Sequence, residues 1–200
     1  MSLKFAASSL FAMVLAAYAS PNLVVNGGFD TGDFTGWTIM ASPAGCSDFG
    51  IANNPADFLS GTGAAFFAGS CVGVYDTIMQ DIPTTIGDDY NFTFFVNNTN
   101  NVGSASDFQA FWDGALVQDL PGMGNSVYTE YSFTEAAAAT ATPIAFQGYN
   151  QPADYYLDDV SVTDLGPASL VAVPEPPLAV LLCSGLGLVL LARRLRLRTA

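Results

Sequence analysis

The chain has 200 residues, of which 50% are hydrophobic and 12% are charged, and its formal net charge at pH 7 is −13. It contains no histidine, and its five basic residues are Lys4 and four arginines close to the C-terminus, so the segment between Ser20 and Pro174 carries no Lys, Arg or His. This composition excludes nucleic-acid binding and charge-driven binding of anionic lipids or acidic polysaccharides by that segment, and it also excludes histidine-dependent nucleophilic catalysis, histidine-ligated zinc and lysine Schiff-base chemistry.

The first 19 residues have the three parts of a secretory signal peptide. Lys4 supplies the positive charge, the run from Phe5 to Ala17 is apolar, and Ala17-Tyr18-Ala19 places small residues at the two positions that a signal peptidase recognises. An uncleaved N-terminal membrane anchor is the alternative, which the shortness of the apolar run disfavours. We expect residues 1–19 to be a signal peptide that signal peptidase removes after Ala19.

Residues 20–165 are predicted to form one all-β domain. Short runs of β-branched and aromatic residues alternate with Gly, Pro, Asn and Asp, which is typical of strands divided by turns. Asp113-Gly114 predicts a tight hairpin turn. The ten predicted strands are NLVV at Asn22, WTIM at Trp37, AAFFA at Ala64, VYDTIMQDI at Val74, YNFTFFVNN at Tyr90, FQAFW at Phe108, ALVQDL at Ala115, VYTEYSF at Val127, PIAFQGY at Pro143 and YYLDDVSVT at Tyr155. This number of short strands with little helical signal indicates a β-sandwich or barrel.

Three stretches of the domain carry a family resemblance. They are NLVVNGGFDTGDFTGWT from Asn22, MQDIPTTIGDDYNFTFFV from Met79 and YYLDDVSVT from Tyr155, in that order. They are similar to the first, middle and last strands of carbohydrate-binding-module jelly rolls with the galactose-binding-like fold. The resemblance extends from residue 22 to residue 164 and implies a jelly-roll β-sandwich. The sequence departs from the family's opening motif at Asp30, where a glutamate commonly stands.

The same resemblance implies a structural calcium ion between the opening and closing strands, at Asp30 and Asp158. Strand alternation places Asp158 on the side of Val160 and Val162, and if these face the core its carboxylate is buried without a basic partner. Such a group either accepts several hydrogen bonds or binds a cation such as Ca²⁺, for which residues 26–28 offer backbone carbonyls. Simple solvation of these carboxylates at a strand end is the alternative.

Aromatic residues beside amides or carboxylates are the candidates for sugar binding, because rings stack on apolar sugar faces and amides recognise hydroxyls. Trp112 is one candidate, since either Phe111 or Trp112 must face outward on a regular strand. Tyr128 and Tyr149 are further candidates, whereas Trp37 is expected in the core. For each of these residues, packing in the sandwich core is the competing and more frequent role.

Two of the three cysteines lie in the predicted domain. Cys46 and Cys71 stand in Gly- and Ser-rich sequence, whereas Cys183 lies in an apolar C-terminal run. In an exported domain such a pair predicts a Cys46–Cys71 disulfide, with two free buried thiols as the alternative. Closing this loop would add roughly 3 kcal/mol to the free energy of unfolding in the chain-entropy model.

Residues 166–173 are predicted to be a linker, and residues 174–200 have three parts of their own. The motif Pro174-Glu175-Pro176 precedes the uncharged run Leu178–Ala192, and the basic residues Arg193, Arg194, Arg196 and Arg198 follow it. As a helix the run would be about 22 Å long against about 30 Å of hydrocarbon, and later leucines and snorkelling arginine stems allow it to span the membrane with the arginines in the cytoplasm. This tail resembles a PEP-CTERM sorting signal. The resemblance implies a bacterial precursor held in the inner membrane, recognised by an exosortase and passed to the cell surface or extracellular matrix.

Three hypotheses on function follow from these features. The first is a non-catalytic surface or matrix protein, and the alternative is a glycan-binding module that attaches to extracellular polysaccharide. The third, a glycoside hydrolase with two catalytic carboxylates, is disfavoured because Glu130 and Glu135 are the only glutamates before the tail and no acid stands out as perturbed. We therefore expect no catalysis, and no cofactor beyond the calcium ion that the resemblance implies.

Overall fold

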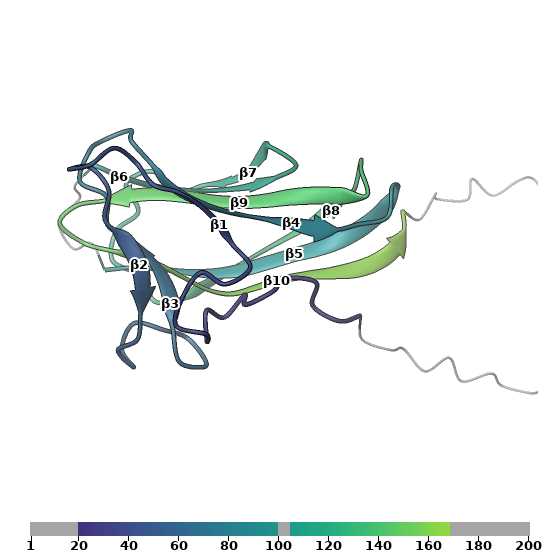
Figure 1. Ribbon diagram of the computed structural model, residues 1–200, viewed down its shortest axis with the longest axis horizontal. Helices are drawn as coiled ribbons and strands as arrows, with labels where there is room; N and C mark the ends of the chain where they lie inside the picture. The colour runs from purple at the N-terminus through teal and green to yellow at the C-terminus, as the bar shows by residue number, and fades with distance from the viewer. Residues whose placement is uncertain (1–19, 100–104, 169–200) are drawn as a thin grey trace, which may run out of the picture. The chain divides into compact units, whose positions relative to one another are not determined.

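The computed structural model describes residues 20–99 and 105–168, which form two antiparallel sheets stacked as two layers (Figure 1). The first sheet has the strand order β1-β4-β9-β6-β7, and the second has the order β2-β3-β10-β5-β8. The strands are β1 Thr38–Met40, β2 Phe49–Ala52, β3 Ala64–Phe67, β4 Asp76–Pro83, β5 Asp88–Asn98, β6 Ser106–Trp112, β7 Ala115–Asp119, β8 Thr129–Ala136, β9 Ala141–Asn150 and β10 Tyr155–Pro167. The predicted all-β jelly-roll sandwich is confirmed.

The predicted terminal segments fall outside this part of the chain. The signal peptide at residues 1–19, the sorting motif, the membrane helix at 178–192 and the arginines all lie outside the described residues. Contacts divide the chain into one unit that ends at Gly166 and a second from Pro167 to Ala200. Among residues 20–99 and 105–168 there is no helix long and apolar enough to cross a membrane.

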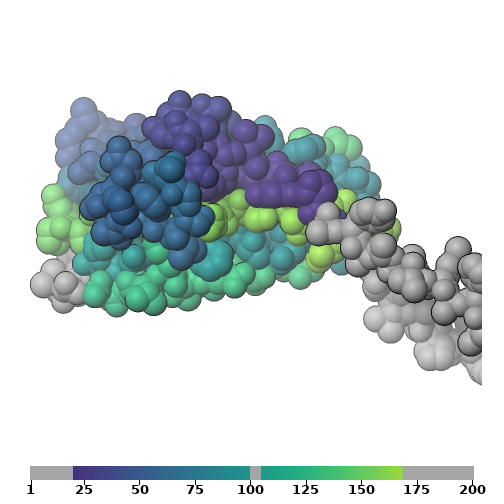
Figure 2. Space-filling view, turned by 90° about the horizontal axis from the view of Figure 1, so that it is seen from below, coloured from purple at the N-terminus to yellow at the C-terminus, as the bar shows by residue number. Residues whose placement is uncertain are grey.

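The first predicted strand is wrong, because residues 22–25 do not join either sheet. The segment instead lies along β10, where Leu23 N donates to Val162 O at 2.8 Å, and Figure 2 shows this purple stretch against the yellow-green strand. The Gln80 side chain of β4 takes the place of a neighbouring strand: its Oε1 accepts from Val25 N at 2.7 Å and its Nε2 donates to Val25 O at 2.9 Å. A side-chain amide thus provides the hydrogen bonds that the expected strand would have made.

Aromatic rings from both sheets fill the core. The ring centroid of Phe146 on β9 lies 5.0–6.1 Å from those of Trp37, Phe92, Phe94 and Phe108. Trp37 is 7% exposed, which confirms its predicted place in the core. Because the inward positions of β4, β6 and β9 are taken by such residues, the alternate positions of these strands form the outer face of the first sheet.

The β6–β7 hairpin turns at Asp113 and Gly114, as predicted. Both residues have positive φ angles, 49° and 77°, which the mirror-image turns of tight hairpins require. An irregularity between Ala110 and Phe111 shifts the register by one residue, so that Gln109 pairs with Asp119 and Ala110 pairs with Gln118. This shift decides which side chain of β7 stands beside Gln109.

The predicted Cys46–Cys71 disulfide is confirmed, with the two Cα atoms 5.0 Å apart. The buried carboxylate of Asp76, at the start of β4, holds the loop that contains Cys46. It accepts hydrogen bonds from Ser42 N at 2.8 Å, Ser47 Oγ at 2.7 Å and Asp48 N at 3.1 Å. The disulfide and this carboxylate together fix the loops around the first residues of β4.

Candidate functional site

A straight row of polar side chains crosses the outer face of the first sheet. Strand register places Thr77 of β4 beside Gln147 of β9, Gln147 beside Gln109 of β6, and Gln109 beside Asp119 of β7. We call these four residues the polar row. Thr77, Gln109 and Gln147 point away from the core because their sequence neighbours Ile78, Phe108 and Phe146 are fully buried in it. Asp119 is the cross-strand partner of Gln109 and lies on the same face.

Hydrogen bonds join the polar row from end to end. Thr77 Oγ1 lies 3.4 Å from Gln147 Oε1, Gln147 Nε2 donates to Gln109 Oε1 at 2.6 Å, and Gln109 Nε2 donates to Asp119 Oδ1 at 3.0 Å. Each amide is therefore held in one orientation before any ligand arrives. Fixed donors and acceptors of this kind give a binding surface its specificity at a low entropic cost.

Two tyrosines and a carboxylate stand at one side of the polar row. The rings of Tyr75 and Tyr149 pack edge to face with centroids 5.1 Å apart, and we call them the tyrosine pair. Asp107 of β6 pairs with Tyr149 and is only 6% exposed. Its Oδ2 accepts from Tyr75 Oη at 2.6 Å and from Gln109 Nε2 at 3.0 Å. Burial raises the pKa of Asp107, and the negative charge of Asp119 raises it further, while the hydrogen bond from Tyr75 opposes the shift.

The three sequence candidates for ligand contact are placed in different parts of the molecule. Trp112 is 3% exposed and its Nε1 donates to Ala136 O at 3.0 Å, so its ring belongs to the core and Phe111 is the outward residue of the two. Tyr128 precedes β8 and donates to Asp57 O at 2.7 Å, which ties it to the loop after β2. Tyr149 is the one that lies on the outer face of the first sheet.

Three carboxylates approach one another beside Gly28, and we call them the acidic trio. A side chain at Gly28 would place its Cβ 3.4 Å from Asp30 Oδ2, 3.5 Å from Asp159 Oδ1 and 3.8 Å from Asp158 Oδ1. Gly61 makes this approach possible, because a Cβ there would lie 1.9 Å from Asp30 Oδ1. The sequence pointed to Asp30 and Asp158, and the structure adds Asp159 through its left-handed backbone, with a φ of 48°.

Asp158 is fully buried and is held by main-chain donors. It accepts hydrogen bonds from Leu59 N at 2.8 Å, Ser60 N at 3.1 Å and Asp159 N at 2.7 Å. Of the two arrangements expected for a buried carboxylate at this position, several hydrogen bonds or a bound cation, the structure shows the hydrogen bonds. Burial raises the pKa of Asp158 to about 6, although the three N–H groups act in the opposite direction.

The acidic trio has the donor chemistry of a calcium site without a closed shell of ligands. Its oxygens are the type that Ca²⁺ prefers, and the domain offers no basic side chain to neutralise them. However, the carbonyls expected to help are already engaged: Asn26 O accepts from Phe29 N and from Trp37 Nε1, and Gly27 O accepts from Val160 N. In the described part of the chain, no three or more acidic, histidine or cysteine side chains are arranged closely enough to hold a metal ion.

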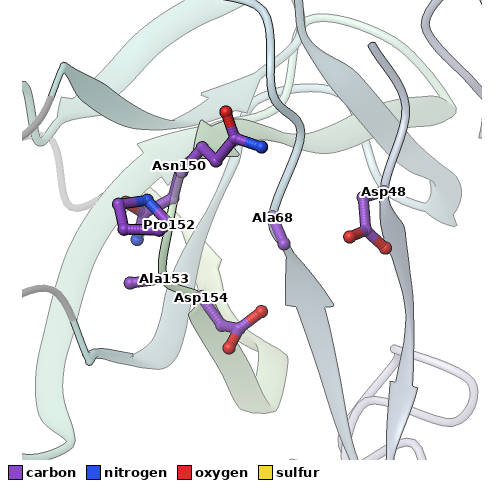
Figure 3. A pocket seen from close by; sticks show the side chains of 7 residues that line it. Asp48, Ala68, Asn150, Pro152, Ala153 and Asp154 are labelled. Carbon is purple, nitrogen blue, oxygen red and sulfur yellow. The ribbon is translucent and has the colours of Figure 1, made fainter. Parts of the chain in front are cut away.

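A hollow of about 270 Å³ lies where β9 turns into β10, directly after Tyr149 in the sequence. It is lined by Asp48, Ala68 and residues 150–154. Figure 3 shows the Asp48 and Asp154 carboxylates on either side of Ala68. Burial raises the pKa of Asp154, and the negative charge of Asp48 adds to this. The domain therefore has a second pair of neighbouring carboxylates, Asp48 and Asp154, away from the outer face of the first sheet.

The domain is similar to solved structures of modules that bind polysaccharides. TmCBM61, solved in complex with β-1,4-galactotriose, matches 72% of this chain and 99% of its own at 14% identity and a TM-score of 0.56. The fold is the jelly roll of carbohydrate-binding modules. The CBM22-1 xylan-binding domain of Paenibacillus barcinonensis Xyn10C matches 76% of this chain and 100% of its own at 14% identity and a TM-score of 0.53.

A third similar structure is the K1 cleaved adhesin domain of Lys-gingipain from Porphyromonas gingivalis. It matches 68% of this chain and 95% of its own at 12% identity and a TM-score of 0.52. No protein-family model and no curated protein matches the sequence. At these identities the jelly-roll likeness establishes the fold, and the function has to be argued from the side chains.

The polar row and Asp107 were not among the sequence candidates. The available signal was alternation: Thr77, Gln109 and Gln147 each occupy an outward position between buried inward ones. What the sequence lacked was the strand order, since β4, β9 and β6 are neighbours in the sheet and are distant in the chain. Polar side chains that are far apart in the sequence are therefore adjacent in the fold.

Proposed function

We propose that this chain is a glycan-binding module and that the outer face of the first sheet binds the polysaccharide. The observation that carries the proposal is the polar row, connected by hydrogen bonds across four strands and placed beside the tyrosine pair. Binding sites for sugars need a few fixed polar groups for the hydroxyls and an aromatic surface for the apolar ring faces. This face offers the fixed polar groups and the partly exposed ring of Tyr75, against which the buried ring of Tyr149 packs. The similarity to TmCBM61 and to a xylan-binding domain, each matched over nearly all of its own length, supports the choice.

A hydrolase with two catalytic carboxylates fits the same face less well. Asp119 belongs to the polar row and Asp107 stands beside it, and Gln109 Nε2 lies 3.0 Å from an oxygen of each. The amide thus occupies the space between them, where a glycosidase needs the scissile bond or the attacking water. The arrangement is suited to holding a sugar and not to cleaving it.

Affinity electrophoresis in gels that contain soluble xylan or β-1,4-galactan tests the proposal. We expect at least one of these polysaccharides, or a soluble polysaccharide with free amino groups in a third gel, to retard the domain. We expect Tyr75→Ala to weaken the retardation about tenfold, because a stacked ring is lost. Tyr131→Ala is the matched control, since Tyr131 lies on β8 of the second sheet and stacks on Phe94. Equal binding by the two variants, or no retardation by any polysaccharide, would contradict the proposal.

We also propose that Asp30 and Asp158 bind a calcium ion, which stabilises the native domain. The ion would be held by Asp30 and Asp158, with Asp159 beside them, and it would supply the positive charge that the domain lacks. Its role would be structural, because the trio contacts the loop between β2 and β3 through Ser60 and Thr62. A bound cation would also keep Asp158 ionised despite its burial.

Thermal unfolding with calcium and with a chelator tests this site. At free calcium about 100 times above Kd, the native state should gain about 2.7 kcal/mol, which raises Tm by roughly 5–10 °C for a domain of this size. Asp30→Asn should remove most of the gain. Asp33→Asn, which changes an exposed carboxylate of the same loop, should keep it. A midpoint that does not respond to calcium in the wild type would exclude the site.

We further propose that the domain acts outside the cytoplasm, exported through the N-terminal signal and tethered by the C-terminal sorting segment until an exosortase acts on it. The Cys46–Cys71 disulfide supports this location, because structural disulfides persist in oxidising compartments. In that setting the glycan-binding face would attach the protein to polysaccharide at the cell surface or in the matrix.

A further inference from the structure

The carboxylate of Asp107 is buried on the binding face with one oxygen lacking a partner. Its Oδ2 accepts from Tyr75 and Gln109, whereas no group of the described residues donates a hydrogen bond to its Oδ1. A buried carboxylate oxygen without a donor costs free energy, and the cost is larger for a charged group than for a neutral one. Its neighbours Tyr75, Gln109 and Tyr149 all belong to the proposed binding face.

No positive charge of the domain can neutralise this group. The chain has no Lys, Arg or His between Ser20 and Pro174, so the anion is balanced only by neutral donors. A second carboxylate, Asp119, stands at the exposed edge of the same row and shares the Gln109 amide with Asp107. Two carboxylates therefore face one short stretch of the sheet.

The tyrosine pair stands beside this charge. Tyr149 is the cross-strand partner of Asp107, and Tyr75 donates its hydroxyl to it. Tyrosine rings attract cations to their faces. Carboxylates beside aromatic rings recognise an organic ammonium group, and no basic side chain of the domain competes for them.

We propose that the face selects a polysaccharide with free amino groups, in which the ammonium of an amino sugar lies against Asp119, Asp107 and the tyrosine pair while Gln109 and Gln147 bind its hydroxyls. The inference rests on the proposed function and specifies its ligand class. It distinguishes deacetylated hexosamine polymers from N-acetylated and neutral ones, and it excludes polyuronates, whose carboxylates would be repelled.

Isothermal titration with short oligosaccharides tests this ligand class. The probes are a glucosamine tetramer, the N-acetylglucosamine tetramer and xylotetraose, so that charge changes while chain length is constant. We expect the glucosamine tetramer to bind at least about tenfold more tightly than the other two, since a hydrogen bond between charged groups is stronger than one between neutral groups. The preference for the glucosamine tetramer should become smaller at high salt without disappearing, because salt screens the buried Asp107 less than the exposed Asp119.

Two isosteric variants and a control identify the carboxylates responsible. Asp107→Asn and Asp119→Asn should each lower the affinity for the glucosamine tetramer about tenfold or more and leave that for xylotetraose within about twofold. Asp81 is an exposed residue of β4 on the same face as Thr77 but outside the polar row. The Asp81→Asn variant should therefore bind the glucosamine tetramer like the wild type. Thermal unfolding of each variant verifies that the fold is kept.

The possible results separate the ligand class from the function. Tighter or equal binding of the acetylated or neutral oligomers would overturn the amino-sugar inference and leave the glycan-binding module standing. An equal loss in all three variants would mean unspecific attraction to an acidic surface, which also overturns it. Absence of binding to any oligomer or polysaccharide would overturn both. A loss confined to Asp107→Asn and Asp119→Asn supports both.

Discussion

Replacing Asp158 with alanine should lower the free energy of unfolding by about 3 kcal/mol or more. The carboxylate accepts hydrogen bonds from the backbone of Leu59, Ser60 and Asp159, and alanine would leave these three donors without their acceptor. A donor left unsatisfied costs about 1–3 kcal/mol where it is buried, and the Asp158 side chain itself is fully buried. Since a domain is stable by only about 5–15 kcal/mol, this single change removes a large share. Urea unfolding measured in the presence of a chelator gives the value without a contribution from calcium.

Two further variants keep this prediction testable if the alanine variant does not fold. Asp158→Asn retains one carbonyl acceptor, so it should lose less stability than Asp158→Ala and more than Asp81→Ala. Asp81 is exposed on β4, and its replacement should change the free energy of unfolding by less than about 0.5 kcal/mol. Equal stability of the Asp158 and Asp81 variants would mean that the carboxylate does not hold the loop between β2 and β3.

The fold could be predicted to the level of its strands because each strand buries one face. In β4 and β9 the inward residues Ile78, Ile82, Ile144 and Phe146 alternate with outward ones, and this period is visible in the sequence. Strand β2 was missed because Phe49–Ala52 contains Gly50 and is flanked by turn residues, so it has no alternation to detect. Residues 22–25 were misassigned for the opposite reason: they are as apolar as a strand, but a side chain, Gln80, completes their hydrogen bonds.

The candidate site could be predicted only in part, because its geometry depends on register. A regular hairpin from the Asp113-Gly114 turn would place Gln118 opposite Gln109. The irregularity at Ala110 and Phe111 places Asp119 there instead, and this substitutes a charge for an amide at the end of the polar row. Nothing in the alternation of β6 or β7 specifies such a one-residue shift. Asp158, in contrast, follows directly from its position two residues before Val160, and its burial was predicted correctly.

Trp112 illustrates the limit of composition as a guide to ligand contacts. A tryptophan next to a hairpin turn has the size and polarity of a sugar platform, yet the Trp112 ring packs on Tyr90 and Phe92. Its neighbour Phe111 faces outward because the strand must present one of the two to the core, and the larger ring buries more apolar area. The aromatic part of the face comes instead from Tyr75, which directly precedes β4, and Tyr149, near the end of β9, whose rings pack on each other.

Replacing Gln109 with alanine should abolish most of the glycan affinity while the sandwich stays folded. Gln109 is the centre of the polar row: its Oε1 accepts from Gln147, and its Nε2 donates to both Asp107 and Asp119. Without it, the amide of Gln147 loses its fixed orientation and the two carboxylates repel each other with no donor between them. The loss of these charge-assisted bonds should weaken binding roughly 10–100-fold. Titration with whichever polysaccharide retards the wild type measures the change.

Gln118→Ala is the matched control for this prediction, since it removes a glutamine from the strand next to Gln109. Gln118 pairs with Ala110 and its amide donates to the Asp119 backbone carbonyl, so it lies outside the polar row. Its replacement should leave the affinity within about twofold of the wild type, because no hydrogen bond of the row is lost. If the two alanine variants bind equally well and melt like the wild type, the outer face of the first sheet is not where the polysaccharide binds. If only Gln109→Ala loses binding, the polysaccharide binds at the polar row that Gln109 connects.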